Sequence, residues 1–201
     1  MKRYIIAVFL LLSLQGMAQR FDADINLGAN LCQIDGDDHG SYNHIGLRAG
    51  VGSSFALGSD IESPWRMVVQ IAFAQKGSEM NHEPLDRSIN LSYVELPVMI
   101  SYNINRLRLA LGIAPAVLVG AKVLDGDELN TPLTENHKRF DALPICAELR
   151  YRLATHLCLE ARYENSMLSI TKENSTGTFR IWRKNTGTFN RLITFGIAYQ
   201  L

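Results

Sequence analysis

Charged side chains recur at alternate positions within otherwise apolar segments of this 201-residue sequence. Lys and Arg number 20, as do Asp and Glu, so every charge has a potential partner and the formal net charge is zero. Charges in an apolar medium are stable only when they are paired or hydrogen-bonded. The set comprises Arg48, Arg66, Lys76, Glu95, Arg108, Glu148, Arg150, Glu160, Arg162 and Glu164, with Asp22, Asp24, Arg106 and Arg152 in the same phase. Two kinds of chemistry fit this pattern: a selective ion conduit, or an ion-paired network that fills a narrow interior.

Residues that could support catalysis or metal binding form no recognisable motif. The histidines, His39, His44, His82, His137 and His156, lie in or beside expected loops without the spacing of a metal site. The acidic segment at 35–40 lacks the downstream Glu of a calcium loop. We therefore predict no catalytic residue, no metal and no cofactor, and a zero net charge gives no electrostatic basis for binding nucleic acid.

Three cysteines, Cys32, Cys146 and Cys158, are widely separated and show no Cys-x-x-Cys spacing. All three share the phase of the small and polar residues in their segments. We predict buried free thiols.

Alternation of apolar and polar residues organises the chain after residue 18. It predicts strands at 22–34, 44–57, 65–76, 88–102, 106–121, 140–153, 157–166 and 191–201. Long polar segments and short turns alternate between these strands. An even strand number with this loop pattern predicts an all-β fold, an eight-stranded antiparallel up-and-down transmembrane β-barrel.

Residue size predicts which face of the strands points inward. Small residues such as Gly46, Gly50 and Ala72 accompany the charges, as the cramped interior of an eight-stranded barrel requires. Large aliphatic residues occupy the other face, where they suit hydrocarbon. The aromatic residues expected at the membrane interfaces are Trp65, Tyr102, Tyr151 and Tyr199 at one end, with Tyr93 and Phe140 toward the other. So narrow an interior favours the ion-paired network over a conduit, and the alternative fold is a soluble, lipocalin-like ligand carrier.

The strand at 88–102 carries the most specific pattern. Glu95 stands within an apolar run, so we expect it to point into the interior toward Arg48 or Lys76. Pro97 removes a ladder donor, and a change of apolar phase near 92–94 predicts a local irregularity. A two-residue turn over Ile104 and Asn105 is expected to follow.

The run Tyr93-Val94-Glu95-Leu96-Pro97 resembles the Y-[LV]-E-[IL]-P strand of PorT-like outer-membrane β-barrel proteins. The Ala-Gln-Lys-Gly segment at 74–77 and the Leu-Gly-Ile-Ala-Pro segment at 111–115 are similar to flanking strands of that family. The resemblance implies a small, non-enzymatic barrel of the cell outer membrane with a structural or interaction role, some relatives of which assist protein secretion.

The N-terminus has the features of an export signal. Lys2 and Arg3 precede a short apolar run, and small residues end at Ala18, so residues 1–18 are predicted to be a signal peptide cleaved between Ala18 and Gln19. The barrel domain is then expected at 19–201.

The expected partners follow from this placement. They are outer-membrane lipid, the barrel assembly machinery, for which the run at 193–201 would be the signal, and envelope or secretion proteins that meet the loops. The alternative function is an outer-membrane lipid-modifying enzyme, for which His82 with Ser78 or Ser88 would be the candidate pair.

The charges also predict how the strands at 140–153 and 157–166 pair. A three-residue turn closing Leu153 onto Leu157 sets Glu148 opposite Arg162 and Arg150 opposite Glu160. A shift either way would oppose like charges, which destabilise a sheet. This register separates Cys146 from Cys158, so no disulfide is expected between them.

Overall fold

The computed structural model describes residues 21–36, 42–58, 63–80, 87–125, 128–130, 138–171 and 188–201. The predicted signal peptide at 1–18, with its cleavage pair Ala18 and Gln19, lies outside the described residues. No helix among the described residues is long and apolar enough to cross a membrane.

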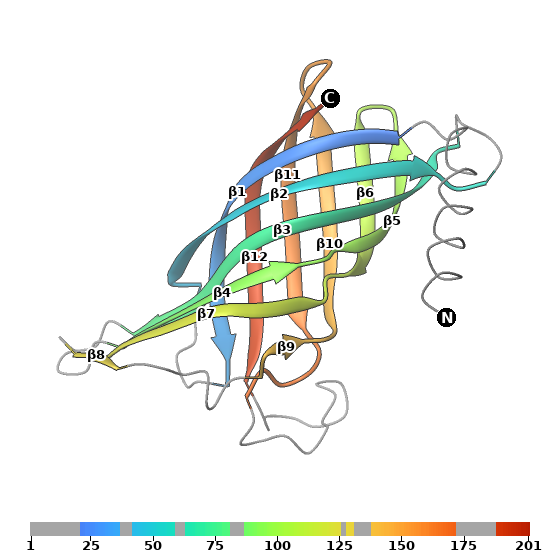
Figure 1. Cartoon of the computed structure of the whole chain (residues 1–201). Coiled ribbons are helices and arrows are strands. Elements are labelled where there is room, and N and C mark those ends of the chain that lie inside the picture. Colours follow the sequence, from blue (N-terminus) through green and yellow to red (C-terminus); the bar gives the residue numbers. More distant parts are fainter. Residues whose placement is uncertain are drawn as a thin grey trace, which may run out of the picture.

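Twelve β-strands form one antiparallel sheet that closes on itself (Figure 1). They are β1 (Phe21–Asp35), β2 (His44–Ala56), β3 (Trp65–Met80), β4 (Arg87–Glu95), β5 (Val98–Ile104), β6 (Leu107–Ile113), β7 (Ala116–Asp125), β8 (Glu128–Asn130), β9 (Phe140–Asp141), β10 (Pro144–Arg152), β11 (Leu157–Ser166) and β12 (Phe189–Gln200). The barrel closes because β1 pairs with β2 on one side and with β12 on the other. Each of β4–β5, β6–β7 and β9–β10 is one interrupted barrel strand, and β8 only extends β7, so the barrel has the predicted eight strands.

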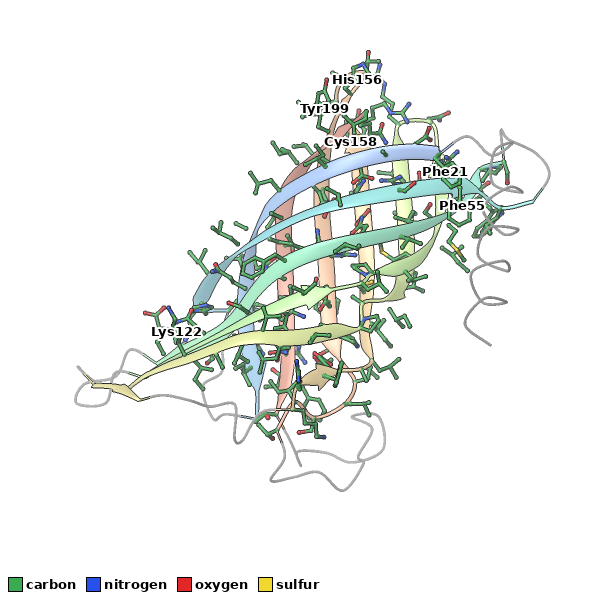
Figure 2. All side chains as sticks on the ribbon, viewed as in Figure 1. Phe21, Phe55, Lys122, His156, Cys158 and Tyr199 are labelled. Carbon is green, nitrogen blue, oxygen red and sulfur yellow. The ribbon has the colours of Figure 1, made fainter. Side chains whose placement is uncertain are left out.

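Side chains alternate between a buried and an exposed face. Along β10, for example, every second side chain from Pro144 to Arg150 is buried. Large apolar side chains cover the outside: Leu111 is 62 % exposed, and Ile71 and Phe195 are each 57 % exposed. Figure 2 shows this layer of outward side chains around the strands. The apolar face is therefore outside, as residue size predicted.

Prolines interrupt three neighbouring barrel strands at one level. Pro97, Pro115 and Pro144 have no N–H to donate, and their carbonyl groups accept 2.9 Å hydrogen bonds from the N–H groups of Gln70, Leu96 and Ala114. The irregularity expected at Pro97 is confirmed, since β4 ends at Glu95 and β5 begins at Val98.

The irregularity predicted near 92–94 is confirmed, but the predicted change of phase along β4 is wrong. Leu91 and Tyr93 are both fully buried, whereas Val94 is 41 % exposed, so β4 keeps a single phase. The register between β4 and β7 does shift between Ser92 and Tyr93, where Val119 is the extra residue of β7. Tyr93 is thus an interior residue and not an interface aromatic, because apolar side chains close this end of the lumen. They are Ile34, Leu91, Tyr93, Ala116, Leu118 and Ile170.

The turn between β5 and β6 also differs from expectation. Ile104 pairs with Leu107, so the turn residues are Asn105 and Arg106 in place of Ile104 and Asn105. Asn105 adopts a positive φ of 53°, which asparagine tolerates better than the β-branched Ile104 would. Every residue pair between β5 and β6 is displaced by two residues from the predicted register. A shift of two keeps each side chain on its predicted face.

The predicted register between β10 and β11 is confirmed. Glu148 lies opposite Arg162, and Arg150 lies opposite Glu160. The N–H of Leu153 donates to the carbonyl of Leu157 at 2.9 Å and closes the turn. All three cysteines are free and buried, as predicted.

Aromatic pairs mark the end of the barrel that carries the short turns. Phe21 and Phe55 have ring centroids 5.9 Å apart, and His156 stacks on Tyr199 at 5.6 Å (Figure 2). Trp65 and Tyr102 contact each other at 4.8 Å. These pairs include three of the four aromatic residues predicted for this end.

Replacing Gly50 with valine is expected to destabilise the barrel by about 1–3 kcal/mol through overpacking. A Cβ on Gly50 would lie 2.8 Å from the Ala72 Cβ and 3.0 Å from the Asn26 Oδ1. Ala49→Val on the exposed face is the matched control and should be nearly neutral. Urea unfolding in detergent micelles, followed by heat-modifiable gel migration, measures both, and equal stability of the two variants would contradict the close packing.

Candidate functional site

Ten of the charges predicted for the inner face lie buried inside the barrel. Their exposed fractions are 8 % or less: Arg48, Arg66, Lys76, Glu95, Arg108, Glu148, Arg150, Glu160, Arg162 and Glu164. Asp24 is buried with them, but the prediction was wrong for Arg106 and Arg152, which are exposed at the end with the short turns, and Asp22 is only half-buried there. We refer to the buried charges as the lumen network.

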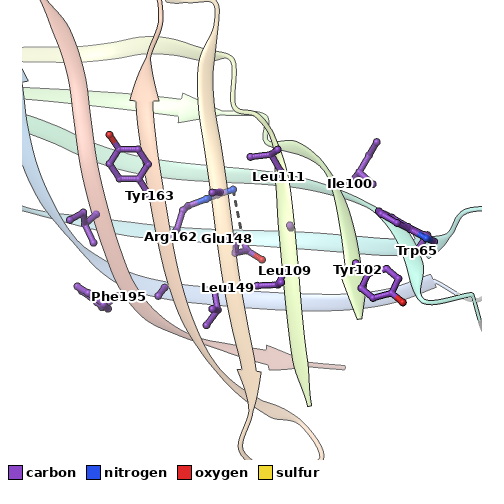
Figure 3. A pocket seen from close by; sticks show the side chains of 14 residues that line it. Trp65, Ile100, Tyr102, Leu109, Leu111, Glu148, Leu149, Arg162, Tyr163 and Phe195 are labelled. Atoms are coloured by element: carbon purple, nitrogen blue, oxygen red, sulfur yellow. Dashed lines mark ion pairs between the residues drawn. The ribbon is translucent and has the colours of Figure 1, made fainter. Parts of the chain in front are cut away.

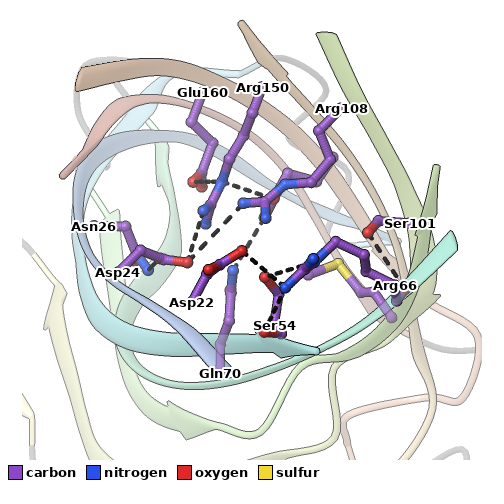
Figure 4. Close-up of polar contacts among 12 residues, drawn as sticks. Asp22, Asp24, Asn26, Ser54, Arg66, Gln70, Ser101, Arg108, Arg150 and Glu160 are labelled. Atoms are coloured by element: carbon purple, nitrogen blue, oxygen red, sulfur yellow. Dashed lines mark hydrogen bonds and ion pairs between the residues drawn. The ribbon is translucent and has the colours of Figure 1, made fainter. Parts of the chain in front are cut away.

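Arg150 is the centre of the network. Its Nε lies 2.8 Å from carboxylate oxygens of both Glu148 and Glu160, and its Nη1 lies 2.9 Å from Asp24. Asp24 comes from β1, and Figure 4 shows its carboxylate beside the guanidinium group of Arg150. One guanidinium therefore joins β10, β11 and β1 through charge-assisted contacts.

Neutral amides bridge the charges in the middle of the lumen. Arg48 donates to the Oδ1 of Asn26 at 2.8 Å and to the Oε1 of Gln70 at 3.0 Å. Gln70 in turn donates to Glu148 at 3.3 Å. Arg162 lies 3.8 Å from the same carboxylate. Sequence reasoning missed both amides, although they share the inward phase of the charges on their strands.

A second cluster lies toward the other end of the lumen. Lys76 Nζ is 2.7 Å from Glu95 and also contacts Glu164, and it lies 5.1 Å from the centroid of the Tyr93 ring. Arg48 Nε lies 3.7 Å from Glu95. Both of the partners expected for Glu95 are therefore present.

Asp141 is a further buried carboxylate that the sequence did not reveal. It is 2 % exposed and accepts hydrogen bonds from Ser166 and, at 3.4 Å, from Asn190. It stands in the two-residue strand β9, too short to show alternation. It adds another acidic group to the cluster around Lys76.

The interior is closely filled in this arrangement. Side chains with less than 2 % exposure include Arg48, Lys76, Glu95, Arg150, Arg162 and Glu164. A polar cavity of about 80 Å³ lies at the short-turn end. A shallow apolar depression of about 620 Å³ lies on the outer wall instead, among Leu109, Leu149, Tyr163 and Phe195 (Figure 3).

The residues considered for other chemistry form no site within the part of the chain that the structure describes. Ser78 is buried within the barrel, Ser88 is half-buried, and His82 lies outside the described residues. His44 is buried, and the Nδ1–H of His156 donates to the carbonyl of Gln200 at 2.8 Å. No group of three or more His, Cys, Asp or Glu within the described ranges is arranged to hold a metal ion.

Comparison with known proteins agrees with this architecture. The family described as outer membrane protein beta-barrel domain matches residues 15–172. The crystal structure of Ail, the attachment invasion locus protein of Yersinia pestis, is 14 % identical over 90 % of this chain and 98 % of its own, with a TM-score of 0.50. Neisserial surface protein A, NspA, is 10 % identical over 90 % and 97 %, with a TM-score of 0.46. No curated protein sequence matches the chain.

Proposed function

This chain belongs to the outer membrane protein beta-barrel domain family and is an integral barrel of the outer membrane, and from that premise we propose that it is a non-enzymatic, non-conducting scaffold. Its lumen network would hold the wall rigid, and its strand tips and surface loops would contact other envelope proteins. The wall itself is solvated by outer-membrane lipid. A soluble carrier does not fit a barrel whose large aliphatic side chains face outward.

The observation that carries the proposal is the placement of Arg150 across the lumen. It contacts carboxylates from three strands, and Arg48 joins Glu160 and Glu95 at 3.6 and 3.7 Å. A passing ion would have to separate these pairs, and breaking one buried pair costs about 3–5 kcal/mol. A permanent ion-paired filling therefore fits the geometry better than a conduit.

Long strands at one end support an interaction role. A barrel strand needs about 9–11 residues to cross a membrane, whereas β3 has 16. The strands β3, β4 and β7 continue together past the rest of the wall, with β8 at their tip (Figure 1). This end lies opposite the short turns, which are periplasmic in such barrels, so the tips are on the cell surface.

Reconstituted into planar lipid bilayers, the native protein is expected to show no steady conductance steps. A variant with Arg150→Ala and Glu160→Ala removes a net-neutral pair from the centre and should admit current, provided that it still shows heat-modifiable migration. Steady conductance of the native protein would contradict the proposal.

A more specific role, in protein secretion or envelope assembly, is suggested by the PorT-like motif at 93–97. In the structure the motif spans the interruption between β4 and β5, with Glu95 bound to Lys76. We propose a supporting role in protein secretion or envelope assembly, after insertion by the barrel assembly machinery through the terminal strand. A deletion strain examined together for secretion, lipid and surface-adhesion defects tests this role, and a defect confined to lipid A would favour the lipid-modifying alternative.

A further inference from the structure

We propose that the periplasmic mouth of the barrel is a binding site for an oxyanion, a phosphate or carboxylate group. The polar cavity of about 80 Å³ at this end has five arginines and one carboxylate, Asp22, among its lining residues. The arginines are Arg66, Arg106, Arg108, Arg150 and Arg152. The proposal adds a ligand site to the scaffold role and does not depend on it.

Two like-charged pairs face each other across β6 and β10 at this mouth. Arg108 lies directly opposite Arg150, and the N–H of Arg152 donates to the carbonyl of Arg106 at 2.8 Å. Like charges opposite each other destabilise a sheet unless an opposite charge lies between or beside them. The ladder of four arginines therefore requires negative charge.

The carboxylates at this mouth supply only part of the negative charge that the arginines require. Arg150 is neutralised by Asp24 at 2.9 Å and by Glu148 and Glu160 at 2.8 Å. Asp22 lies 2.8 Å from Arg66, but the carboxylate paired with Arg108 is Asp24, at 4.0 Å from the Nη2. None of the ion pairs within the described part of the chain includes Arg106 or Arg152. The mouth thus keeps a surplus of positive charge.

Guanidinium nitrogens at this cavity are buried without a hydrogen bond within the described part of the chain. Arg108 is 8 % exposed, yet its Nη2 has no hydrogen-bond partner among the described residues, and neither has the Nη2 of the buried Arg150. Figure 4 shows both guanidinium groups pointing toward the aspartates in the lumen. A buried donor without a partner is unfavourable, so a ligand with several acceptor oxygens is favoured here.

An oxyanion suits both the size and the chemistry of the cavity. A water occupies about 30 Å³ in the liquid, so the cavity has room for a group of a few non-hydrogen atoms. The planar guanidinium fork matches the paired oxygens of phosphate and carboxylate. Because the short turns face the periplasm, the group could belong to a soluble anion or to the headgroup of an inner-leaflet phospholipid.

Titration calorimetry with inorganic phosphate tests the site on the full-length protein in maltoside micelles, with sodium chloride holding the ionic strength constant. Saturable binding at one site is expected. The rim variant Arg106→Gln with Arg152→Gln should bind phosphate at least about tenfold more weakly, because each lost charge-assisted contact is worth roughly that factor. Arg106→Lys with Arg152→Lys keeps the charge without the fork and should lie between the two.

The matched control removes the same charge at the opposite end. Lys138→Gln with Arg139→Gln should leave phosphate affinity within about twofold of the native value, since screening confines charge effects to about 10 Å. Adding phosphatidylglycerol to the micelles distinguishes a phospholipid headgroup from a soluble anion as the ligand. Competition with phosphate identifies a lipid headgroup, and its absence identifies a soluble anion. Non-saturable binding, or equal affinity of the native protein and the glutamine rim variant, would overturn the proposal.

Discussion

Lys76→Met is expected to lower the free energy of unfolding by about 3–5 kcal/mol, enough to prevent folding if the barrel is only marginally stable. Lys76 is fully buried and contacts both Glu95 and Glu164, which are equally buried. Methionine preserves most of the volume of lysine but none of its charge. Two buried carboxylates would then remain, and the closest ion pair left to them in the described part of the chain is that of Glu95 with Arg48, at 3.7 Å.

A compensated variant separates lost charge from lost packing. Combining Lys76→Met with Glu95→Gln and Glu164→Gln removes the lysine and the two charges that it neutralises. Urea unfolding in micelles, followed by tryptophan fluorescence, should show the triple variant to be clearly more stable than Lys76→Met alone. If the triple variant is no more stable than Lys76→Met, the ion pairs of Lys76 do not account for its contribution to stability.

The barrel could be predicted because lipid outside and the polar lumen inside require opposite residue types at alternate positions of each strand. Arg150 and Leu149 are neighbours in sequence, but one is 2 % exposed in the lumen and the other 41 % exposed on the wall. Alternation fixes faces but not registers that differ by two residues, which is why the turn at Asn105 was misplaced. It also cannot distinguish lipid from an apolar patch of the interior, which is why Tyr93 was assigned to the membrane interface.

The sequence predicted which charged residues belong to the lumen network, but only some of the contacts between them. Charge patterning selected the pairing between β10 and β11, where neighbours are close in sequence. The contact between Arg150 and Asp24 crosses the lumen and depends on how β1 closes against β12. Asn26 and Gln70 were missed because a neutral amide in the inward phase does not stand out among small polar residues.

Glu148→Arg is expected to be the most damaging single substitution in the lumen. Glu148 lies 2.8 Å from Arg150 and 3.8 Å from Arg162, with both oxygens buried. An arginine there would face two arginines without a partner, and the loss should exceed the roughly 3–5 kcal/mol of a broken buried pair. The fraction of heat-modifiable protein after refolding measures the effect. Glu79→Arg, partly exposed near the tip of β3, is the control and should fold normally.

Arg162→Glu in the same chain should restore much of the loss from Glu148→Arg. The reversed pair occupies the same cross-strand positions, while Arg150 keeps its contacts with Glu160 and Asp24. Coupling between contacting residues of this kind is typically about 0.5–3 kcal/mol, so rescue should be substantial but incomplete. A double variant that folds less well than either single variant would show that Glu148 and Arg162 do not stabilise each other, and that the contacts of Glu148 with Arg150 and Gln70 account for its effect.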